Sequence, residues 1–498
     1  MKKIIVYMFL SIFLMGGLSS CFEDDGNYDY DDIFEVSVAG LEDSYLCYSL
    51  IDSLNLVPQI TPKDEEYDCF WGVYLTNVQG YAPRMDTICH TRELHMLVDL
   101  APNTYRLIFC AKEKNSGIPK FAEMNLEVVT PLSTGWYVLR GKNGTTDLDL
   151  FSPRGKVEDV IAKNNGGRAL EGEAVCLGHS NRYKSKDPVN NRYVNTNTLF
   201  AFSSKGLASV RLSDGKIIHD FNTGFYSTPT ERHPQAFFAN HMGDIYFLNA
   251  GNVYTLYGMS PNSGRLGEGK IGDHKLSDFC VGHLRGTPIL FDEKISSFCS
   301  ADASGSNLIY FKDQKTEVSS NNMNIDLLYM GAGADKNWAI AKNKDSGDLQ
   351  LLQLNPYAAV ASRWKPSYID LIVSSQSISN DKGLGQASKW APNTTNNIIY
   401  FAKGNMIGSC NIDAELAEKE QYKLPVEEEV TYMRNLSFKN STTNFNVLAV
   451  ATSTGEKYKV YLFTIQAGNL IGEPQIMEGT GKVSALIYID KSSATQLF

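Results

Sequence analysis

The sequence predicts an all-β protein in which an immunoglobulin-like β-sandwich precedes a β-propeller of seven blades. The chain has 498 residues, too many for one compact core, so we expect two or three folding units. Residues 33–130 read as short strands in which apolar and polar side chains alternate, without a long helical period. Residues 131–498 repeat a hairpin of two apolar strands. These two patterns define the two predicted domains.

The composition argues against extensive disorder and against a nucleic-acid partner. Hydrophobic residues make up 43% of the chain and aromatic residues 11%, which is enough to build ordinary cores. The formal net charge is −10. Binding to a phosphate backbone needs clustered lysine and arginine side chains that replace condensed counterions. We therefore expect no nucleic acid among the partners.

The amino terminus predicts an exported lipoprotein. Two lysines precede an apolar run at 4–18, which is short for a membrane-spanning helix and typical of a secretory signal. The run ends in Leu18-Ser19-Ser20-Cys21, which resembles the bacterial lipobox. Residues 1–20 are then a lipoprotein signal peptide, and Cys21 carries the lipid that holds the protein to a bilayer. The alternative is an ordinary signal cleaved elsewhere, with Cys21 incidental.

An acidic tether follows at residues 21–32. The stretch from Phe22 to Asp32 contains six acidic residues and no basic residue, a composition that stays solvated. Directly after a lipobox, such a run also resembles the export signal that sends Bacteroidota lipoproteins to the outer leaflet of the outer membrane. We predict a cell-surface protein that is lipid-anchored in the outer membrane. A plain linker on a periplasm-facing anchor is the alternative.

The sandwich is predicted from the alternation within residues 33–130. Around Met124, apolar residues alternate with polar ones, as in a half-buried strand. The segment from Tyr105 to Phe109 shows the same period, and the connection at 112–117 can join the two as an antiparallel pair. Short strands over about one hundred residues are typical of an immunoglobulin-type sandwich. A strand-rich linker that orders only against its neighbour is the alternative.

The propeller is predicted from seven hairpins that begin with Trp136–Leu139 and Leu148–Phe151. The hairpin turns lie near positions 143, 205, 250, 293, 345, 404 and 455. A repeat of roughly forty to sixty residues made of strands alone is typical of a propeller, in which radial stacking buries both faces of each sheet. Six or eight blades, a large sandwich or a stacked solenoid are the alternatives.

Three features together resemble the PKD-like family lipoproteins of Bacteroidota. They are the tether Asp25-Gly26-Asn27-Tyr28-Asp29-Tyr30 after the lipobox, the sandwich-like stretch, and Gly135-Trp136-Tyr137-Val138-Leu139 at the start of the blades. The resemblance implies a PKD-like sandwich. It also implies an accessory role beside SusC/SusD-like or other TonB-dependent uptake systems, in capturing a glycan, a peptide or a ferric siderophore. Only Cys21 is carried over as a functional residue.

Linear catalytic motifs are missing from the sequence. His-Glu-x-x-His, Gly-x-Ser-x-Gly and Cys-x-x-Cys do not occur. Gly264 to Lys270 has the spacing of a P-loop, but Ile271 stands where a magnesium-binding serine or threonine is required. We interpret this stretch as a Gly-rich turn. We predict no cofactor, no metal site and no enzymatic activity.

Eight cysteines remain after Cys21, and two of them lie where sandwich strands could bring thiols together. Cys69 stands beside Phe70 and Trp71, and Cys110 ends the strand that contains Tyr105. An export compartment permits a disulfide between Cys69 and Cys110. Buried free thiols are the alternative.

Candidate ligand-binding residues lie outside the strand repeats, because propeller ligands usually meet loops at one end of the central channel. Tyr226, Arg232 and His233 could stack on and hydrogen-bond to a sugar, and Arg232 could meet an anionic ferric catecholate. Trp364 and Trp390 could form a ligand platform. A solvated inter-blade loop and packing beneath a loop are the respective alternatives.

The leading hypothesis is a non-enzymatic surface lipoprotein that binds a nutrient for a TonB-dependent transporter complex. The alternative is a propeller-based hydrolase or lyase that acts on a polymer at the cell surface. A structural partner of a transporter is a third possibility. Two facing carboxylates would favour the enzyme, an aromatic shelf a glycan, and a basic aromatic pocket a siderophore.

Overall fold

The computed structural model describes residues 36–62, 66–76, 83–187, 191–259, 261, 263–333, 335–359, 369–490 and 493. β-strands predominate, and the helical elements are short, as in α2 (Val160–Asn164). The all-β prediction is confirmed. Among the described residues, none of the helices has the length and apolar character needed to span a bilayer. The predicted signal peptide, Cys21 and the tether lie outside the described residues.

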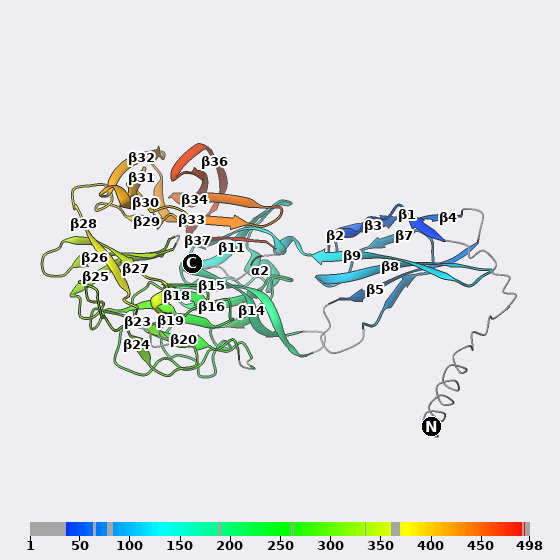
Figure 1. The fold of residues 1–498 in the computed structure, drawn as a ribbon, viewed down its shortest axis with the longest axis horizontal. Coiled ribbons are helices and arrows are strands. Elements are labelled where there is room, and N and C mark those ends of the chain that lie inside the picture. Colours follow the sequence, from blue (N-terminus) through cyan, green and yellow to red (C-terminus); the bar gives the residue numbers. More distant parts are fainter. Residues whose placement is uncertain are drawn as a thin grey trace, which may run out of the picture. The chain divides into compact units, whose positions relative to one another are not determined.

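The chain forms two compact units that divide between Val128 and Val129, and the first is a β-sandwich (Figure 1). Its strands are Ser37–Ala39 (β1), Ser44–Tyr48 (β2), Ser53–Leu56 (β3), Gln59–Thr61 (β4), Tyr67–Leu75 (β5), Asp86–Cys89 (β6), Leu94–Leu97 (β7), Asn103–Glu113 (β8) and Pro119–Val129 (β9). A five-stranded sheet, β2-β9-β8-β5-β6, is accompanied by the pairs β3-β7 and β1-β4. Tyr105 pairs with Leu126 across β8 and β9, as the alternation predicts.

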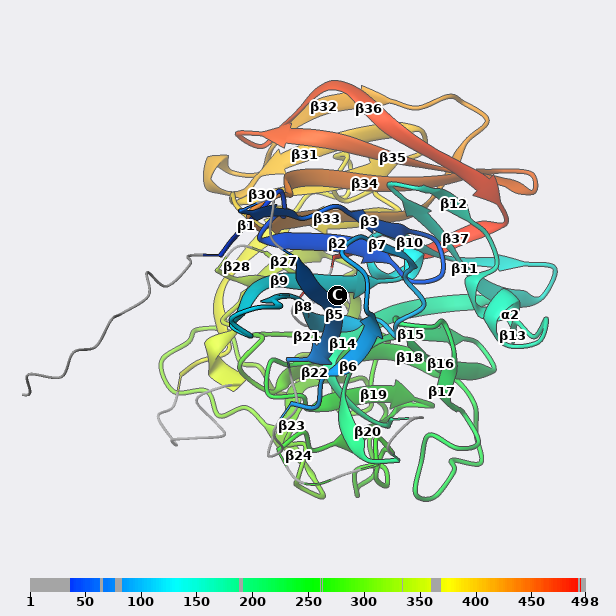
Figure 2. The same cartoon turned by 90° about the vertical axis from the view of Figure 1, so that its right-hand side faces the viewer.

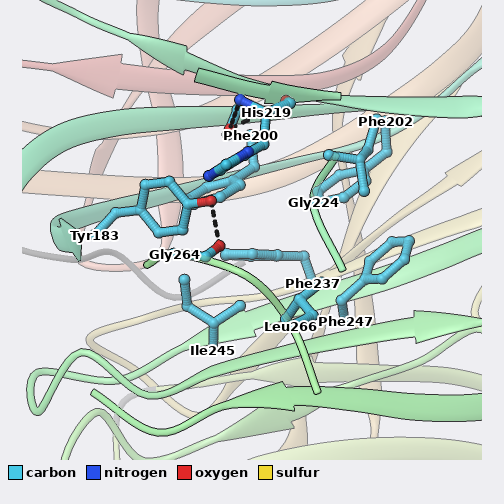
Figure 3. A pocket seen from close by; sticks show the side chains of 12 residues that line it. Tyr183, Phe200, Phe202, His219, Gly224, Phe237, Ile245, Phe247, Gly264 and Leu266 are labelled. Carbon is cyan, nitrogen blue, oxygen red and sulfur yellow. Dashed lines mark hydrogen bonds between the residues drawn. The ribbon is translucent and has the colours of Figure 1, made fainter. Parts of the chain in front are cut away.

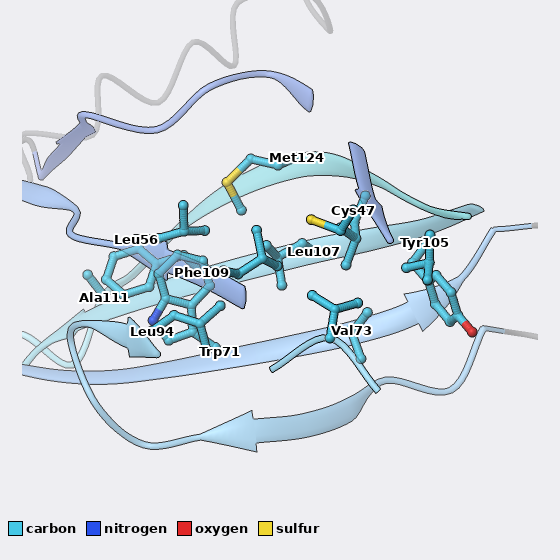
Figure 4. Close-up of a cluster of buried hydrophobic side chains, with 14 of the residues drawn as sticks. Cys47, Leu56, Trp71, Val73, Leu94, Tyr105, Leu107, Phe109, Ala111 and Met124 are labelled. Carbon is cyan, nitrogen blue, oxygen red and sulfur yellow. The ribbon is translucent and has the colours of Figure 1, made fainter. Parts of the chain in front are cut away.

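The sandwich core consists of side chains that meet between these sheets (Figure 4). Trp71 and Phe109 are fully buried and lie with their ring centroids 4.8 Å apart. Leu56 and Leu94, from the small β3-β7 pair, complete the same cluster. The predicted immunoglobulin-like sandwich is confirmed, because a single core joins the sheets.

The second unit is a β-propeller. Its strands are Gly135–Lys142 (β10), Thr145–Ser152 (β11), Gly155–Val157 (β12), Leu170–Glu171 (β13), Ala174–Lys186 (β14), Tyr193–Ser203 (β15), Gly206–Arg211 (β16), Ile217–Asp220 (β17), Pro234–Ala239 (β18), Ile245–Asn249 (β19), Asn252–Leu256 (β20), Val281–Gly282 (β21), Pro288–Asp292 (β22), Ser297–Ala301 (β23), Leu308–Tyr310 (β24), Ile325–Ala332 (β25), Asn337–Asn343 (β26), Leu349–Leu354 (β27), Ile372–Ile378 (β28), Lys389–Pro392 (β29), Ile398–Lys403 (β30), Met406–Asn411 (β31), Ala417–Lys423 (β32), Glu429–Lys439 (β33), Asn444–Thr454 (β34), Lys457–Gln466 (β35), Asn469–Thr480 (β36) and Lys482–Ile489 (β37). Within the described ranges they form seven antiparallel sheets.

We number these sheets as blades. Blade 1 is β37-β10-β11-β12 with β13 paired to β11, and blades 2 to 7 are β14–β17, β18–β20, β21–β24, β25–β28, β29–β32 and β33–β36. They follow one another around a ring (Figure 2). All seven predicted hairpins are formed, six of them by the two central strands of a blade and the third by β19 and β20 of the three-stranded blade 3. The fourth differs in one detail: β23 begins at Ser297 rather than Ile295, because Ser296 adopts a left-handed turn conformation with φ 51°.

The ring is closed by its two ends. The last strand, β37, pairs with β10, so that Tyr488 lies opposite Trp136 and Leu486 opposite Val138. The innermost strand of blade 1 is therefore supplied by the carboxyl-terminal end of the unit. β37 also contacts the first strands of its two neighbours, β14 and β33. Gly135 begins β10 with φ 145°, and a Cβ there would lie 2.4 Å from the carbonyl oxygen of Phe151.

The closure predicts a stability defect for Leu486→Ala. Leu486 is fully buried against Val138 and Val460 in the core between blades 1 and 7. Truncation removes this packing and leaves a cavity, so we expect the free energy of unfolding to fall by about 3 kcal/mol. Urea denaturation of the purified chain measures the change. Val426→Ala, at a side chain that is 84% exposed, is the control and should change it by less than about 0.5 kcal/mol. Equal stability of the two variants would contradict the proposed role of β37.

Candidate functional site

The structure places the predicted ligand-binding residues Tyr226, Arg232 and His233 on the connection between blades 2 and 3, where they contact different neighbours. The Tyr226 side chain is 64% exposed, and its hydroxyl lies 3.2 Å from Oγ of Ser263. Arg232 donates to Oδ1 of Asn222 at 2.6 Å and lies over the Phe221 ring. His233 is exposed, and its backbone N–H donates to Asn249. The structure places the three residues on one exposed loop but does not turn their side chains toward a shared point.

A small cavity lies next to this loop, between blades 2 and 3 (Figure 3). Phenylalanine and leucine side chains form most of its wall, and the Tyr183 hydroxyl donates to the carbonyl oxygen of Gly264 at 2.5 Å. His219 also lines it, and burial lowers the pKa of this histidine. The free volume is about 20 Å³, room for about one water molecule. The cavity is therefore part of the inter-blade core and too small for a nutrient.

Of the two predicted tryptophans, Trp364 lies outside the described residues. Trp390 lies on β29, the innermost strand of blade 6, and is partly exposed. Its indole N–H donates to the carbonyl oxygen of Leu384 at 3.1 Å. One part of the ring packs against the core between blades 5 and 6. Trp390 thus combines the predicted packing with a position near the axis of the ring.

Trp390 belongs to a group of partly exposed side chains on consecutive blades, which we call the axial aromatic cluster. Its members are Phe279, Tyr329, Trp390, Tyr432 and Arg434. The Tyr329 ring lies 5.9 Å from Trp390 and 6.1 Å from Phe279, measured between centroids. Phe279 stands just before β21 of blade 4, and the others lie on β25, β29 and β33, the inner strands of blades 5 to 7.

The charge of Arg434 acts on two tyrosines of this cluster. Burial raises the pKa of Tyr329, and the nearby Arg434 guanidinium opposes that rise. Burial likewise raises the pKa of Tyr432, which Arg434 lowers through its charge and a hydrogen bond. Tyr329 and Arg434 belong to blades 5 and 7, which are not neighbours. Their interaction therefore reaches across the inner end of blade 6, where the inner strands converge.

β-bulges determine where the two tyrosines point. In β25 the register with β26 shifts between Leu327 and Tyr329, and in β33 the register with β34 shifts between Val430 and Tyr432. An extra residue in one strand turns the side chains that follow it. The Tyr329 hydroxyl then lies over Gly331, where a Cβ would be 2.2 Å from it. A glycine at 331 is thus needed for this tyrosine conformation.

A carboxylate stands near the axis on another part of the ring. Gln235, at a bulge in β18, donates to Oδ1 of Asp278 at 2.7 Å. Burial raises the pKa of Cys176 on β14, and the charge of Asp278 raises it further. Cys176 and Asp278 belong to blades 2 and 4, so this interaction also crosses the inner end of an intervening blade. An arginine on β33 and an aspartate in the segment just before β21 therefore lie on the inner side of the ring.

The proposed disulfide between Cys69 and Cys110 is not formed in the structure, where both thiols are free. Cys69 pairs with Ala111, and Phe70 pairs with Cys110 across β5 and β8. Paired residues point to the same face of a sheet, and successive residues point to opposite faces. The two thiols thus lie on opposite faces, which explains why the predicted bond is wrong. Burial raises the pKa of both.

The Gly-rich stretch that ends in Lys270 serves the fold. Nζ of this buried lysine donates to Thr255 Oγ1 at 3.0 Å, to the carbonyl oxygen of Asp302 at 2.9 Å and to that of Gly305. Burial lowers the pKa of Lys270 to about 8, against the opposing charge of Asp302. Among the residues that the structure describes, no three histidine, cysteine, aspartate or glutamate side chains gather as a metal site would require.

One family model matches the amino-terminal part of the chain. A model of the PKD-like family matches residues 21–173, which include the sandwich and the first strands of blade 1. No curated protein matches the chain.

Solved structures give remote similarities. A quinoprotein alcohol dehydrogenase-like protein from Bacteroides thetaiotaomicron has a TM-score of 0.39 at 10% identity, over 90% of this chain and 96% of that chain. The WD40 domain of SCAP from fission yeast has a TM-score of 0.36 at 9% identity, over 62% and 74%. The extracellular domain of a protein described as a hybrid two component system, from B. thetaiotaomicron, has a TM-score of 0.21 at 9% identity, over 80% and 69%.

The strand register predicts that Cys69 and Cys110 remain reduced in the secreted protein. All eight described cysteines are free, so we expect each of them to be alkylated by iodoacetamide in denaturant without a reductant. Intact mass spectrometry counts the adducts, and a sample treated with reductant is the control. A count that rises by two on reduction, with the new adducts on Cys69 and Cys110, would contradict the register.

Proposed function

We propose that this protein is a non-enzymatic surface lipoprotein that captures a glycan for a TonB-dependent uptake system. The observation that carries the proposal is the axial aromatic cluster. Aromatic side chains are usually buried, and several partly exposed ones at one place suggest a binding surface. Here Phe279, Tyr329 and Trp390 are partly exposed on three consecutive blades.

The chemistry of the cluster favours a glycan over a siderophore. An aromatic face packs against the C–H face of a sugar ring, while nearby polar groups bind its hydroxyls. Among the described residues the Tyr329 hydroxyl has no hydrogen-bond partner, so it is available to a ligand. The positive charge of Arg434 on β33 is accompanied by the negative charge of Asp278, which lies just before β21. A ferric catecholate would be better served by a basic pocket.

The location rests on the amino terminus. Leu18-Ser19-Ser20-Cys21 resembles a lipobox, and the acidic run after it resembles a surface-export signal. The PKD-like family match begins at residue 21, which is the first residue of the proposed mature protein. The association with a TonB-dependent transporter follows from the resemblance to PKD-like family lipoproteins.

The anchor is tested by Cys21→Ser. In a Bacteroidota host grown with a radioactive or alkyne-tagged fatty acid, we expect the unaltered protein to incorporate the label and to fractionate with outer membranes. The variant should carry no label and should leave the membrane fraction, because the thioether-linked lipid is its only anchor in this proposal. Cys176→Ser serves as a cysteine control. Labelling that persists in Cys21→Ser would overturn the anchor.

Glycan capture is tested with a panel of soluble polysaccharides: starch, xylan, yeast mannan, arabinan and polygalacturonate. We expect affinity electrophoresis to show retardation by at least one of them. Trp390→Ala and Tyr329→Ala should each weaken that binding about tenfold, equivalent to roughly 1.4 kcal/mol, because each removes one stacking face. Tyr226→Ala removes an exposed tyrosine from the loop between blades 2 and 3, and should leave binding unchanged.

Two results would contradict this function. If none of the polysaccharides retards the protein, the proposal of glycan binding is contradicted. If Tyr329→Ala and Tyr226→Ala bind equally well, the axial aromatic cluster is not the binding site. The same mixtures also test the alternative, a hydrolase or lyase. New reducing ends or unsaturated products released from the polymer by the purified protein would establish an enzyme.

A further inference from the structure

A groove lies where the propeller closes, between blades 1 and 7. Its volume is about 620 Å³, within the range of about 300 to 1,000 Å³ that small-molecule sites occupy. We call it the seam groove. It is lined by Gly135, Trp136, Phe151, Ser152, Pro153, Gly155, Lys156, Gln475, Ile476, Met477, Glu478 and Tyr488. None of the residues named in the axial aromatic cluster lines it.

One wall of the seam groove is a row of three aromatic side chains. Trp136 on β10 pairs with Tyr488 on β37 and with Phe151 on β11. Because paired residues share a face of a sheet, the three side chains stand side by side across blade 1. The ring centroids of Trp136 and Tyr488 lie 5.1 Å apart. All three side chains are partly exposed.

This row is held in place from behind by blade 7. Phe445 lies 5.0 Å from Trp136 and 5.1 Å from Tyr488, measured between ring centroids. Phe438 adds a further contact to Tyr488 at 5.2 Å. Neither Phe438 nor Phe445 lines the groove. The aromatic wall is therefore preorganised, so a ligand would not have to order it on binding.

Lys156 extends the aromatic row on blade 1, because it pairs with Phe151 across β11 and β12, and the opposite wall is formed by residues 475–478 of β36. Nζ of Lys156 donates to Oε1 of Glu158 at 2.7 Å and to the carbonyl oxygen of Glu478 at 2.8 Å. Lys156 also lies 5.2 Å above the Phe151 ring. Gln475 is exposed and lies on the same face of β36 as the buried Met477. The groove thus offers the amide of Gln475, the ammonium group of Lys156, which is paired with Glu158, and the exposed carboxylate of Glu478 as hydrogen-bonding groups.

From these features we infer that the seam groove binds a neutral saccharide, as a second site distinct from the axial aromatic cluster. An aromatic row opposite polar groups matches a sugar ring, which has a C–H face and a hydroxyl edge. An anionic ligand would need a free positive charge, and Lys156 is paired with Glu158. Only the choice of ligand class rests on the proposed function, because the geometry of the groove is independent of it.

Two other grooves of similar volume do not share this chemistry. One, of about 550 Å³ between blades 4 and 5, carries several charged groups, including the ion pair of Lys275 with Glu293. The other, of about 560 Å³, is lined by charged side chains such as Asp370 together with hydroxyl and aliphatic side chains such as Ser374 and Val373. Neither presents an aromatic row, so we assign the saccharide to the seam groove alone.

A titration that counts binding sites tests the inference. The probes are neutral trisaccharides, namely maltotriose, xylotriose, mannotriose and arabinotriose. Isothermal titration calorimetry of the full mature protein should give two sites for one of them. Trp136→Leu should reduce the number to one, and Trp390→Ala should also reduce it to one. Gln475→Ala, on the exposed rim, should weaken the seam site about threefold to tenfold.

Tyr226→Leu is the matched control, since it also replaces a partly or fully exposed aromatic ring by leucine, and Tyr226 lies on the loop between blades 2 and 3 and does not line the groove. It should keep both sites. If Trp136→Leu fails to fold, Gln475→Ala carries the test, because its exposed side chain is not part of a core.

The outcomes separate the two proposals. If the unaltered protein shows a single site, and this site is lost in Trp390→Ala but kept in Trp136→Leu and Gln475→Ala, the seam groove is overturned and the axial site stands. If the single site is instead lost in Trp136→Leu and kept in Trp390→Ala, the result supports the seam groove and overturns the axial site. Binding of none of the four trisaccharides would overturn the seam inference.

Discussion

The closure of the propeller by β37 is the constraint on which the larger unit depends. Each blade is a small sheet with two apolar faces, so it is stable only between two neighbours. A linear array would leave the first and last blades with an uncovered face. The pairing of Tyr488 with Trp136 and of Leu486 with Val138 makes the first blade from both ends of the unit. The buried core that follows, between β37, β10 and blade 7, covers both faces at once.

The register of the innermost strands determines which side chains face the axis of the ring, where a ligand could contact them. Five of these strands, β14, β18, β25, β33 and β37, contain a register shift against their neighbour. A regular strand would alternate its side chains between the two adjoining inter-blade cores. A bulge breaks that alternation and turns a side chain out of the core. Tyr329 and Tyr432 both follow such a shift, and both are partly exposed.

The sequence predicts structure well where the signal lies within one short stretch of chain. It predicts less where the outcome depends on how two strands are aligned with each other. Apolar pairs such as Ile398–Phe401 and Met406–Ser409 predict a hairpin because two strands and a turn lie within one short stretch. The disulfide prediction is wrong because a shift of one residue in the strand register decides whether Cys69 and Cys110 lie on the same face of the sheet. The bulge before Tyr329 is likewise invisible until the partner strand is known. Trp390 was found because a tryptophan is rare and large, whereas its neighbour Tyr329 carries no local signal.

The seam groove was out of reach of sequence reasoning for a further reason. Its wall joins Trp136 from the first strand of the unit to Tyr488 from the last, and only the closure of the ring brings them together. Because the proposed saccharide site depends on this closure, ligand binding there is coupled to the stability of the closed ring. A ligand held by this row contacts both ends of the propeller chain, and anything that binds the closed ring but not the opened one stabilises the closed form. The aromatic side chains can remain partly exposed at this place because their other faces are covered by Phe445 and by the buried pairing of Leu486 with Val138. Closure and recognition therefore depend on the same contacts, so the surface that a ligand would meet is as rigid as the ring itself.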